Sequence, residues 1–252
     1  MKVVLVDFLN AYPLYFALVN KIIDNDIEFI RKMPSVCARM LYEKQVDVGI
    51  APSIEYAKSD YYIVPNVCIS SDYKVKSVAL FLKKPLNEVK TVKLDKNSNT
   101  SVALTKVLFA YKYKINVEYT QDKADCELVI GDNALYRIEH TDEQVIDLAY
   151  EWLEFSGYPF VFALWIANKK IPTHYIDLFL KAKNWGINHL EIIAEAFCDT
   201  HNYDYNKAYD YLKNNLSYDL TENKIKSLDM FFNYSYKLNL IPNKPNIHFL
   251  NE

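Results

Sequence analysis

Three short polar segments carry most of the chemical information in this chain. Each lies where a strand is expected to run into a loop or a helix: Phe8-Leu9-Asn10, Lys76-Ser77-Val78 and Asn99-Thr100-Ser101. They offer hydroxyl and amide side chains, and they contain no histidine, cysteine or glycine-rich loop. Such groups can donate hydrogen bonds to a small anion. We therefore expect a site for an anionic small molecule, although the spacing alone does not identify the ligand.

The third segment gives the clearest physical reason for binding. A strand is expected to end near Leu94, a polar loop follows, and a helix is expected to begin near Thr100. The first N–H groups of a helix have no acceptor within the helix, and the helix dipole favours a negative charge there. The hydroxyls of Thr100 and Ser101 add two donors, with Asn99 beside them. Plain helix capping, without any ligand, explains the same residues equally well.

Two further polar residues follow predicted strands in the N-terminal part. Asn10 can cap the helix expected from Tyr12, or it can direct its amide into a cleft. Ser53 follows the strand that ends near Ala51 and opens a similar junction. Ser77 is expected within a strand, where a lone serine is usually structural.

Gly131 and Asp132 follow another predicted strand. Asp132 can cap the next helical turn or act in the site. Asp7 interrupts a buried strand, which is costly unless the carboxylate is paired or lies at the strand edge.

The bulk composition excludes several classes of protein. The 252 residues have a net charge of −3 and include only three arginines, so a nucleic-acid partner is not expected. No run of 18 apolar residues predicts a membrane span. Met1 leads directly into a buried-strand pattern without a secretion signal, so we expect a cytoplasmic protein.

The cysteines and histidines do not form a recognisable metal or catalytic motif. The four cysteines are far apart and lack a CxxC pair, which favours reduced thiols over disulfides or metal ligands. The five histidines fall outside the three polar segments, and no HExxH pair occurs. We therefore expect neither a metal nor a cofactor.

The hydrophobic pattern predicts alternating strands and helices. The order strand–helix–strand–helix–strand at the start is typical of a parallel sheet with right-handed crossovers. Strands are expected at 3–8, 27–31, 46–51, 64–70, 75–82, 91–94, 115–119, 127–130, 145–148 and 160–167. Helices are expected at 12–20, 34–42, 100–111, 150–155, 175–198, 205–216 and 221–238.

These elements predict two α/β lobes. One lobe comprises residues 1–83 plus 166–252, including the C-terminal helices, and the other comprises residues 88–160. Crossing segments near 82–88 and 160–167 would form a hinge. Ligands of open α/β sheets bind at the carboxyl ends of strands, and pockets favour domain interfaces, so a central cleft is expected.

Six segments, in this order, carry a resemblance to a known family. They are Phe8-Leu9-Asn10-Ala11-Tyr12-Pro13-Leu14, the segment Asp47 to Tyr56, Val75-Lys76-Ser77-Val78, Thr100-Ser101-Val102, Ile130-Gly131-Asp132-Asn133-Ala134-Leu135 and the segment Gly157 to Trp165. Together they closely resemble the chorismate dehydratases of the futalosine route to menaquinone. The resemblance spans about residues 3–167. One departure is Asp72-Tyr73-Lys74, where a glycine commonly precedes the serine-bearing strand in the family.

The resemblance implies a two-lobed, type II periplasmic-binding-protein-like fold used as an enzyme. It implies dehydration of chorismate to 3-[(1-carboxyvinyl)oxy]benzoate. By the same match, Asn10 and Ser77 stand at the functional asparagine and serine of the family, and Thr100 and Ser101 at its pair of hydroxyls where a helix begins. It implies chorismate as the partner, without a nucleic acid or a membrane, and leaves the oligomeric state open.

The resemblance leaves two questions open. Asn10 is neutral and cannot remove a proton, so the base is either Asp132 or the enolpyruvyl carboxylate of the substrate. The alternative functions are a solute-binding protein of the same fold and the related 1,4-dihydroxy-6-naphthoate synthase. The missing export signal disfavours the first, and the Phe8-Leu9-Asn10-Ala11 opening disfavours the second.

Overall fold

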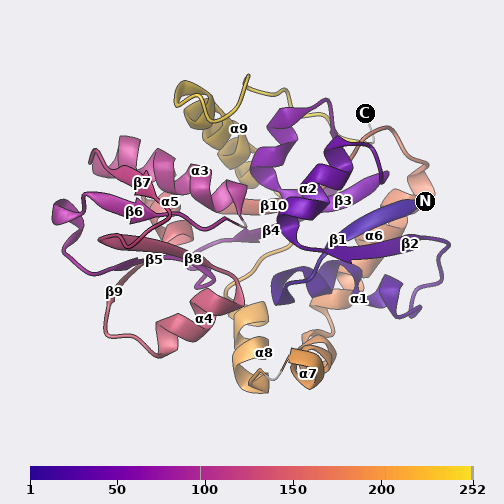
Figure 1. Ribbon diagram of the computed structural model, residues 1–252. Coiled ribbons are helices and arrows are strands. Elements are labelled where there is room, and N and C mark those ends of the chain that lie inside the picture. The colour runs from indigo at the N-terminus through magenta and orange to yellow at the C-terminus, as the bar shows by residue number, and fades with distance from the viewer. Residues whose placement is uncertain (97, 202, 251–252) are drawn as a thin grey trace.

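The chain folds into two sheets that lie side by side, with helices packed around each (Figure 1). The computed structural model describes residues 1–96, 98–201 and 203–250. The elements of the first half are β1 (Lys2–Val6), η1 (Leu9–Ala11), α1 (Tyr12–Val19), β2 (Glu28–Lys32), α2 (Pro34–Tyr42), β3 (Val48–Pro52), η2 (Ser53–Lys58), β4 (Tyr62–Ser71), β5 (Val78–Leu82), η3 (Leu86–Glu88), β6 (Thr91–Lys93), α3 (Asn99–Val107), η4 (Leu108–Tyr113) and β7 (Glu118–Thr120). Those of the second half are β8 (Cys126–Ile130), α4 (Asp132–Glu139), β9 (Gln144–Asp147), α5 (Leu148–Ser156), β10 (Phe160–Ala167), α6 (Thr173–Ile187), α7 (Leu190–His201), α8 (Tyr205–Asn214) and α9 (Glu222–Lys237).

The first sheet has the order β2-β1-β3-β10-β4. Strand β1 pairs in parallel with β2 and β3, as the strand–helix alternation predicts. Strand β10 returns from the second half of the chain and pairs antiparallel with β3 and β4. Strand β1 ends at Val6, so Asp7 lies beyond the strand, where it is exposed and accepts a hydrogen bond from the hydroxyl of Tyr12 at 3.1 Å. The carboxylate is therefore neither buried nor unpaired, so it does not carry the energetic cost of an unpaired buried charge.

The second sheet repeats this plan, with the order β7-β6-β8-β5-β9. Strand β6 is parallel to β7 and β8, whereas β5 is antiparallel to β8 and β9. This pairing corrects the prediction that residues 75–82 belong with the lobe of residues 1–83. Because all five residues of β5 are buried, their apolar run indicates a strand but not which sheet will contain it.

The chain therefore crosses between the sheets earlier than predicted. It leaves the first sheet after Ser71 and enters the second at Val78, so the first crossing is the segment 72–77 rather than 82–88. It returns between Ser156, where α5 ends, and Phe160, where β10 begins. Residues 160–167, predicted as the return crossing, form a strand of the first sheet.

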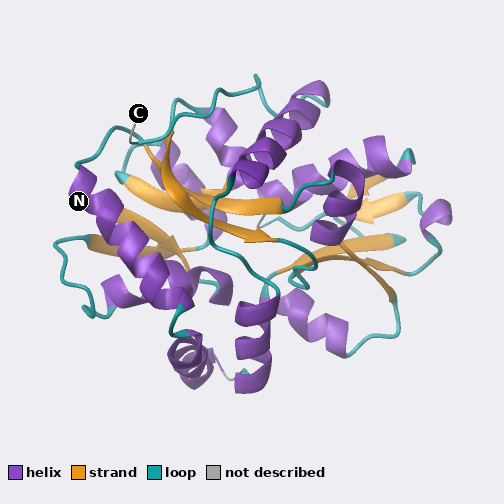
Figure 2. Ribbon diagram, turned by 180° about the vertical axis from the view of Figure 1, so that it is seen from behind, coloured by secondary structure: helices purple, strands orange, loops and turns teal. Residues whose placement is uncertain are grey.

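The C-terminal helices connect the two halves. The predicted helix 175–198 is two helices, because α6 ends at Ile187 and α7 begins at Leu190. Helix α6 packs on α1, and α9 contacts both β10 of the first sheet and α3 beside the second. Seen from behind, helices lie around the strands of both sheets (Figure 2). Buried apolar side chains from both sheets form one connected core.

Candidate active site

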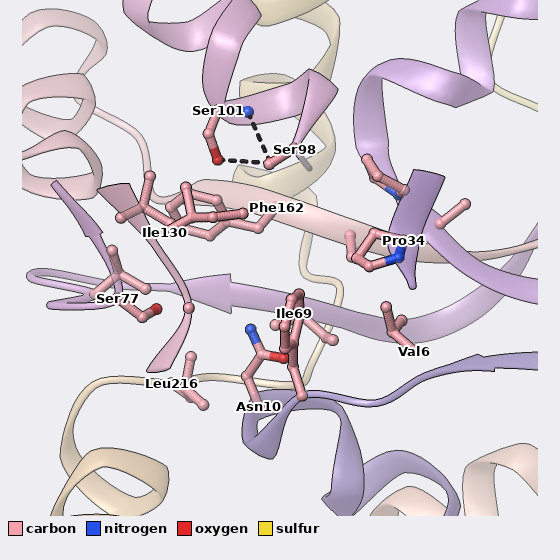
Figure 3. Close-up of a pocket in the computed structure, with 17 residues that line it drawn as sticks. Val6, Asn10, Pro34, Ile69, Ser77, Ser98, Ser101, Ile130, Phe162 and Leu216 are labelled. Carbon is pink, nitrogen blue, oxygen red and sulfur yellow. Dashed lines mark hydrogen bonds between the residues drawn. The ribbon is translucent and has the colours of Figure 1, made fainter. Parts of the chain in front are cut away.

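A pocket lies between the two sheets, at the strand ends that face each other. Its space between atoms is about 640 Å³, part of which is open to solvent. Its lining includes Val6, Asn10, Pro34, Ile69 and Phe162 from elements of the first-sheet half, Ser77, Ser98, Ser101, Ile130 and Gly131 from the crossing segment and the second-sheet half, and Leu216 from the segment after α8. Figure 3 shows the labelled side chains around the pocket.

Asn10 enters the pocket from the short helix η1, directly after strand β1. The residue at the N-cap of α1 is Ala11, and no side chain caps that helix, so Asn10 does not serve as the predicted cap. Its amide instead points into the pocket (Figure 3). The hydroxyl of Tyr218 donates to the backbone carbonyl of Asn10 at 3.0 Å. This bond holds η1 in place and leaves the side-chain amide of Asn10 available.

Ser77 lies just before β5, not inside a strand as predicted, and its backbone is tightly held. Lys76 has a φ of 59°, and the N–H of Ser77 donates back to the carbonyl of Val75 at 2.6 Å. The N–H of Gly131 donates to the carbonyl of Ser77 at 2.7 Å. This turn points the side chain toward the pocket instead of across the sheet.

Asp147 stabilises the turn at Lys76 and Ser77 through its carboxylate. Its carboxylate accepts hydrogen bonds from the N–H groups of Lys76 at 2.7 Å and Val75 at 3.2 Å. It also caps α5 by accepting from the N–H groups of Ala149 and Tyr150. One carboxylate therefore joins the crossing segment to a helix of the second sheet, and the sequence analysis missed it because these partners lie about 70 residues apart.

The hydroxyl of Ser77 has one direct partner outside the pocket. The phenol of Tyr211, on helix α8, donates a hydrogen bond to Ser77 Oγ at 2.7 Å. Tyr211 is almost completely buried, and burial raises its pKa well above the usual range of a tyrosine, so the phenol stays protonated. The tyrosine-rich C-terminal helices gave no sequence signal that would single out this residue.

Helix α3 begins at the pocket, and its N-cap is Ser98. Ser98 Oγ accepts from the N–H of Ser101 at 3.2 Å and lies 2.8 Å from Ser101 Oγ (Figure 3). Both serines line the pocket. Ser101 is one of the predicted site residues and Ser98 is not, although a serine directly before the first turn of a helix is a typical N-cap.

The neighbouring candidates Ser53, Asn99 and Thr100 do not line the pocket. Thr100 Oγ1 accepts from the N–H of Ile54 at 3.1 Å, and Ser53 Oγ donates to the carbonyl of Val161 at 2.8 Å. The Asn99 amide donates to a carboxylate oxygen of Glu55 at 2.6 Å. Asn99 and Thr100 therefore connect α3 to η2, Ser53 connects η2 to β10, and none of the three lines the pocket.

Gly131 and Asp132 follow β8 and behave differently. Gly131 lines the pocket with φ 64° and ψ −148°, a conformation that is essentially restricted to glycine. Asp132 is the first residue of α4, makes no capping bond there, and does not line the pocket. Burial raises the pKa of Asp132. The nearby His201 lowers this pKa in part, and the charge of Asp7 raises it further.

The described pocket lining contains no ionisable side chain. Its polar groups are the amide of Asn10 and the hydroxyls of Ser77, Ser98 and Ser101, set among apolar walls. No cluster of histidine, cysteine or acidic residues suited to a metal ion occurs in the described part of the chain. The arrangement can orient an anionic ligand and donate hydrogen bonds to charge that develops on it.

No helix among residues 1–96, 98–201 and 203–250 is both long and apolar enough to span a membrane.

The five histidines do not line the pocket. Three of them, His140, His189 and His201, instead place a ring nitrogen beside the backbone carbonyl four residues earlier.

Comparison with known sequences identifies the family. Residues 1–237 match the menaquinone biosynthesis family, and the chain belongs to it. A chorismate dehydratase of Campylobacter jejuni is 27% identical over 93% of this chain and 97% of the relative. A chorismate dehydratase of Thermus thermophilus is 26% identical over 66% of this chain and 72% of the relative.

Comparison with solved structures confirms the predicted fold. Protein AF1704 from Archaeoglobus fulgidus has a TM-score of 0.76 at 15% identity and covers 95% of this chain and 98% of its own. The aliphatic sulphonate binding protein SsuA from Escherichia coli has a TM-score of 0.68 at 12% identity, covering 98% and 95%. A Candida albicans protein described as having the generic periplasmic binding protein fold has a TM-score of 0.63 at 13% identity, covering 99% and 97%. The two-sheet arrangement is therefore that of periplasmic binding proteins.

Proposed function

We propose that this member of the menaquinone biosynthesis family is a chorismate dehydratase, a hydro-lyase of the futalosine route. It eliminates water from chorismate and forms 3-[(1-carboxyvinyl)oxy]benzoate. The observation that carries the proposal is that Asn10, Ser77 and the start of α3, which are far apart in the sequence, all line one pocket. The two curated relatives, both chorismate dehydratases, support the same activity.

The reaction requires little chemistry from the protein. The bond from C-3 to hydrogen breaks, its electrons form the third double bond of the ring, and the C-4 hydroxyl leaves and is protonated to water. The ring carboxylate acidifies the C-3 hydrogen through the conjugated double bond, and the aromatic product supplies the driving force. The protein must mainly orient the substrate and stabilise developing charge.

The polar groups of the pocket can be assigned to these tasks. The first N–H groups of α3, together with the hydroxyls of Ser98 and Ser101, hold a carboxylate of the substrate. Asn10, which follows β1 of the first sheet, and Ser77, which precedes β5 of the second, hydrogen-bond the reacting face (Figure 3). Ser77 donates to the departing C-4 oxygen.

The base in this proposal is the enolpyruvyl carboxylate of the substrate. No ionisable side chain belongs to the described pocket lining, and the amide of Asn10 cannot accept a proton at neutral pH. The enolpyruvyl ether is attached to C-3, so its carboxylate can reach the hydrogen on that carbon. Asp132, the alternative base, lies next to Gly131 but outside the lining.

The test is incubation of the purified protein with chorismate while the aromatic product is followed by absorbance and mass spectrometry. We expect turnover in the wild type, and a loss of about 100-fold or more in Asn10→Ala and Ser77→Ala, as for removal of a donor from a site that stabilises charge. Asn188→Ala and Ser59→Ala change exposed residues of the same types and serve as controls.

Two outcomes would overturn the proposal. Binding of chorismate without any turnover would identify a solute-binding protein, as in several proteins of the same fold. Failure to bind chorismate, with formation of 1,4-dihydroxy-6-naphthoate from its own precursor, would identify the other enzyme of the pathway.

A further inference from the structure

The only direct hydrogen-bond donor to Ser77 Oγ among the described residues is the phenol of Tyr211, which comes from the C-terminal helix α8. The O–O distance is 2.7 Å, Tyr211 is 3% exposed and Ser77 is 2% exposed. Tyr211 does not line the pocket, so it does not touch a ligand there. It can act on the reaction only through Ser77.

The direction of this hydrogen bond decides what Ser77 can do. A serine hydroxyl has one proton and accepts through its lone pairs. Because Tyr211 donates to Ser77 Oγ, the proton of Ser77 is free to point toward another acceptor, and the remaining side of the hydroxyl faces the pocket.

We propose that Tyr211 is a positioning residue for the elimination: its phenol commits the Ser77 hydroxyl to donating into the pocket, toward the departing oxygen of the substrate. This inference rests on the proposed function. Chains of hydrogen bonds also polarise one another, so the donation from Tyr211 makes Ser77 a better donor. Loss of the phenol leaves Ser77 free to turn its proton away from the substrate.

Helix α8 is held in the position that this contact needs. Lys207 and Asp210 of α8 form ion pairs with Glu139 of α4 and with Lys76, the residue before Ser77. Together with the hydrogen bond from Tyr211 to Ser77, helix α8 therefore contacts α4 and the crossing segment 72–77 at three points (Figure 1). The arrangement brings a C-terminal tyrosine to a serine that lies 134 residues earlier.

The test is a double-mutant cycle with Tyr211→Phe and Ser77→Ala, measured by chorismate turnover. Tyr211→Phe should lower kcat about tenfold, the equivalent of one neutral hydrogen bond, with a change in KM of less than about twofold. Ser77→Ala should lower kcat about 100-fold. Because Tyr211 acts through Ser77, the double variant should be no slower than Ser77→Ala alone.

Tyr209→Phe is the matched control. Tyr209 lies on the same helix, and its hydroxyl donates to Glu191, away from the pocket. This variant should retain the wild-type kcat. Active sites are counted by titration with chorismate, so that any misfolded fraction of Tyr211→Phe does not enter kcat.

Different results overturn different claims. If the wild-type protein does not turn over chorismate, the proposed function is wrong, independently of the result for Tyr211→Phe. Normal kcat in Tyr211→Phe, with an active wild type, overturns the inference alone. So does a double variant in which the two losses multiply to about 1,000-fold, because independent effects are additive in free energy.

Discussion

At the scale of single residues, the pocket combines neutral donors with apolar walls. Asn10, Ser77, Ser98 and Ser101 supply its amide and hydroxyl groups, and none of them carries a charge. In an apolar environment such dipoles interact more strongly with developing charge than they do in water. A substrate that brings its own carboxylate can therefore supply the base, while the protein supplies orientation and hydrogen bonds.

The first prediction concerns Asp132. If the substrate carboxylate is the base, Asp132→Asn should keep kcat within about threefold of the wild type, because only the local electrostatics change. Steady-state kinetics with chorismate, with the fold checked by circular dichroism, provides the measurement. Asp142→Asn, a change at an exposed carboxylate, is the control.

The opposite result is equally clear. Removal of a true general base typically lowers the rate by about 100-fold or more. A loss of that size in correctly folded Asp132→Asn would make Asp132 the base and would exclude substrate-assisted proton removal.

At the scale of elements, turns between strands and helices determine where the donors lie. The turn from β8 to α4 passes through Gly131, whose N–H donates to the carbonyl of Ser77 at 2.7 Å. The N-cap of helix α3 is Ser98, and both Ser98 and Ser101 line the pocket. Neither position is set by the strands or helices themselves; each depends on the conformation of one or two residues between them.

The second prediction is that Gly131→Ala destabilises the protein by about 1–3 kcal/mol and lowers kcat. A Cβ there would lie 3.7 Å from the ring of Phe8, so space is adequate and the cost comes from the backbone conformation. If the backbone relaxes, the hydrogen bond to the carbonyl of Ser77 changes with it. Urea unfolding and chorismate kinetics measure the two effects.

Gly157→Ala is the matched control, because Gly157 also has a positive φ, of 76°, and no atom lies within 4 Å of the added Cβ. It should cost about 1–2 kcal/mol and leave kcat unchanged. Equal loss of kcat in both variants would show that general destabilisation, and not the turn beside Ser77, accounts for the effect.

At the scale of the whole molecule, the two sheets are joined by more than the crossing segments 72–77 and 157–159. The indole N–H of Trp152 on α5 donates to Ser227 on α9 at 2.8 Å, in a region that is fully buried. Helix α9 also contacts β10 and α3. The C-terminal helices therefore help to fix how the two sides of the pocket face each other.

The third prediction concerns how stability changes with pH. Lys84 and the N–H groups of Lys90 and Thr91 lower the pKa of Asp125 to about 2. Because this lies below the unfolded value of about 4, ionised Asp125 stabilises the fold above about pH 4, and the contribution is lost as the pH falls toward about 2. The free energy of unfolding should therefore decrease over this range.

Asp125→Asn isolates the effect. The difference in unfolding free energy between wild type and variant should be largest at neutral pH and should shrink toward pH 2, in urea titrations at a series of pH values. A difference that stays constant across the range would contradict the assigned cause.

Much of the fold was predictable because local patterns report local structure. Apolar runs identified the strands, and the early strand–helix alternation identified the parallel pairing of β1 with β2 and β3. The assignment of residues 75–82 to the first lobe was wrong, because a fully buried strand has the same pattern in either sheet. The single helix predicted at 175–198 was wrong because the apolar spacing continues past Gly186 and Asn188, although a glycine near the end of a helix is a recognised stop signal.

The candidate site was predictable only in part. Asn10, Ser77, Ser101 and Gly131 line the pocket, whereas Ser53, Asn99, Thr100 and Asp132 do not belong to the lining. At the start of α3, adjacent residues point in different directions around the helix. Sequence position therefore identifies the turn that faces the pocket, but not which of its side chains do so.

The sequence by itself determined the types of groups available to this protein: uncharged donors after strands, few arginines and no metal-binding motif. It also determined the α/β class, because hydrophobic periodicity depends on neighbours a few residues apart. Only the tertiary structure decided that Tyr211 donates to Ser77, that Asp147 holds the turn before it, and that Thr100 bonds to Ile54 instead of lining the pocket. Those contacts join residues 46 to 134 positions apart, and a hydrogen bond depends on distance and direction in space, which local sequence patterns do not encode.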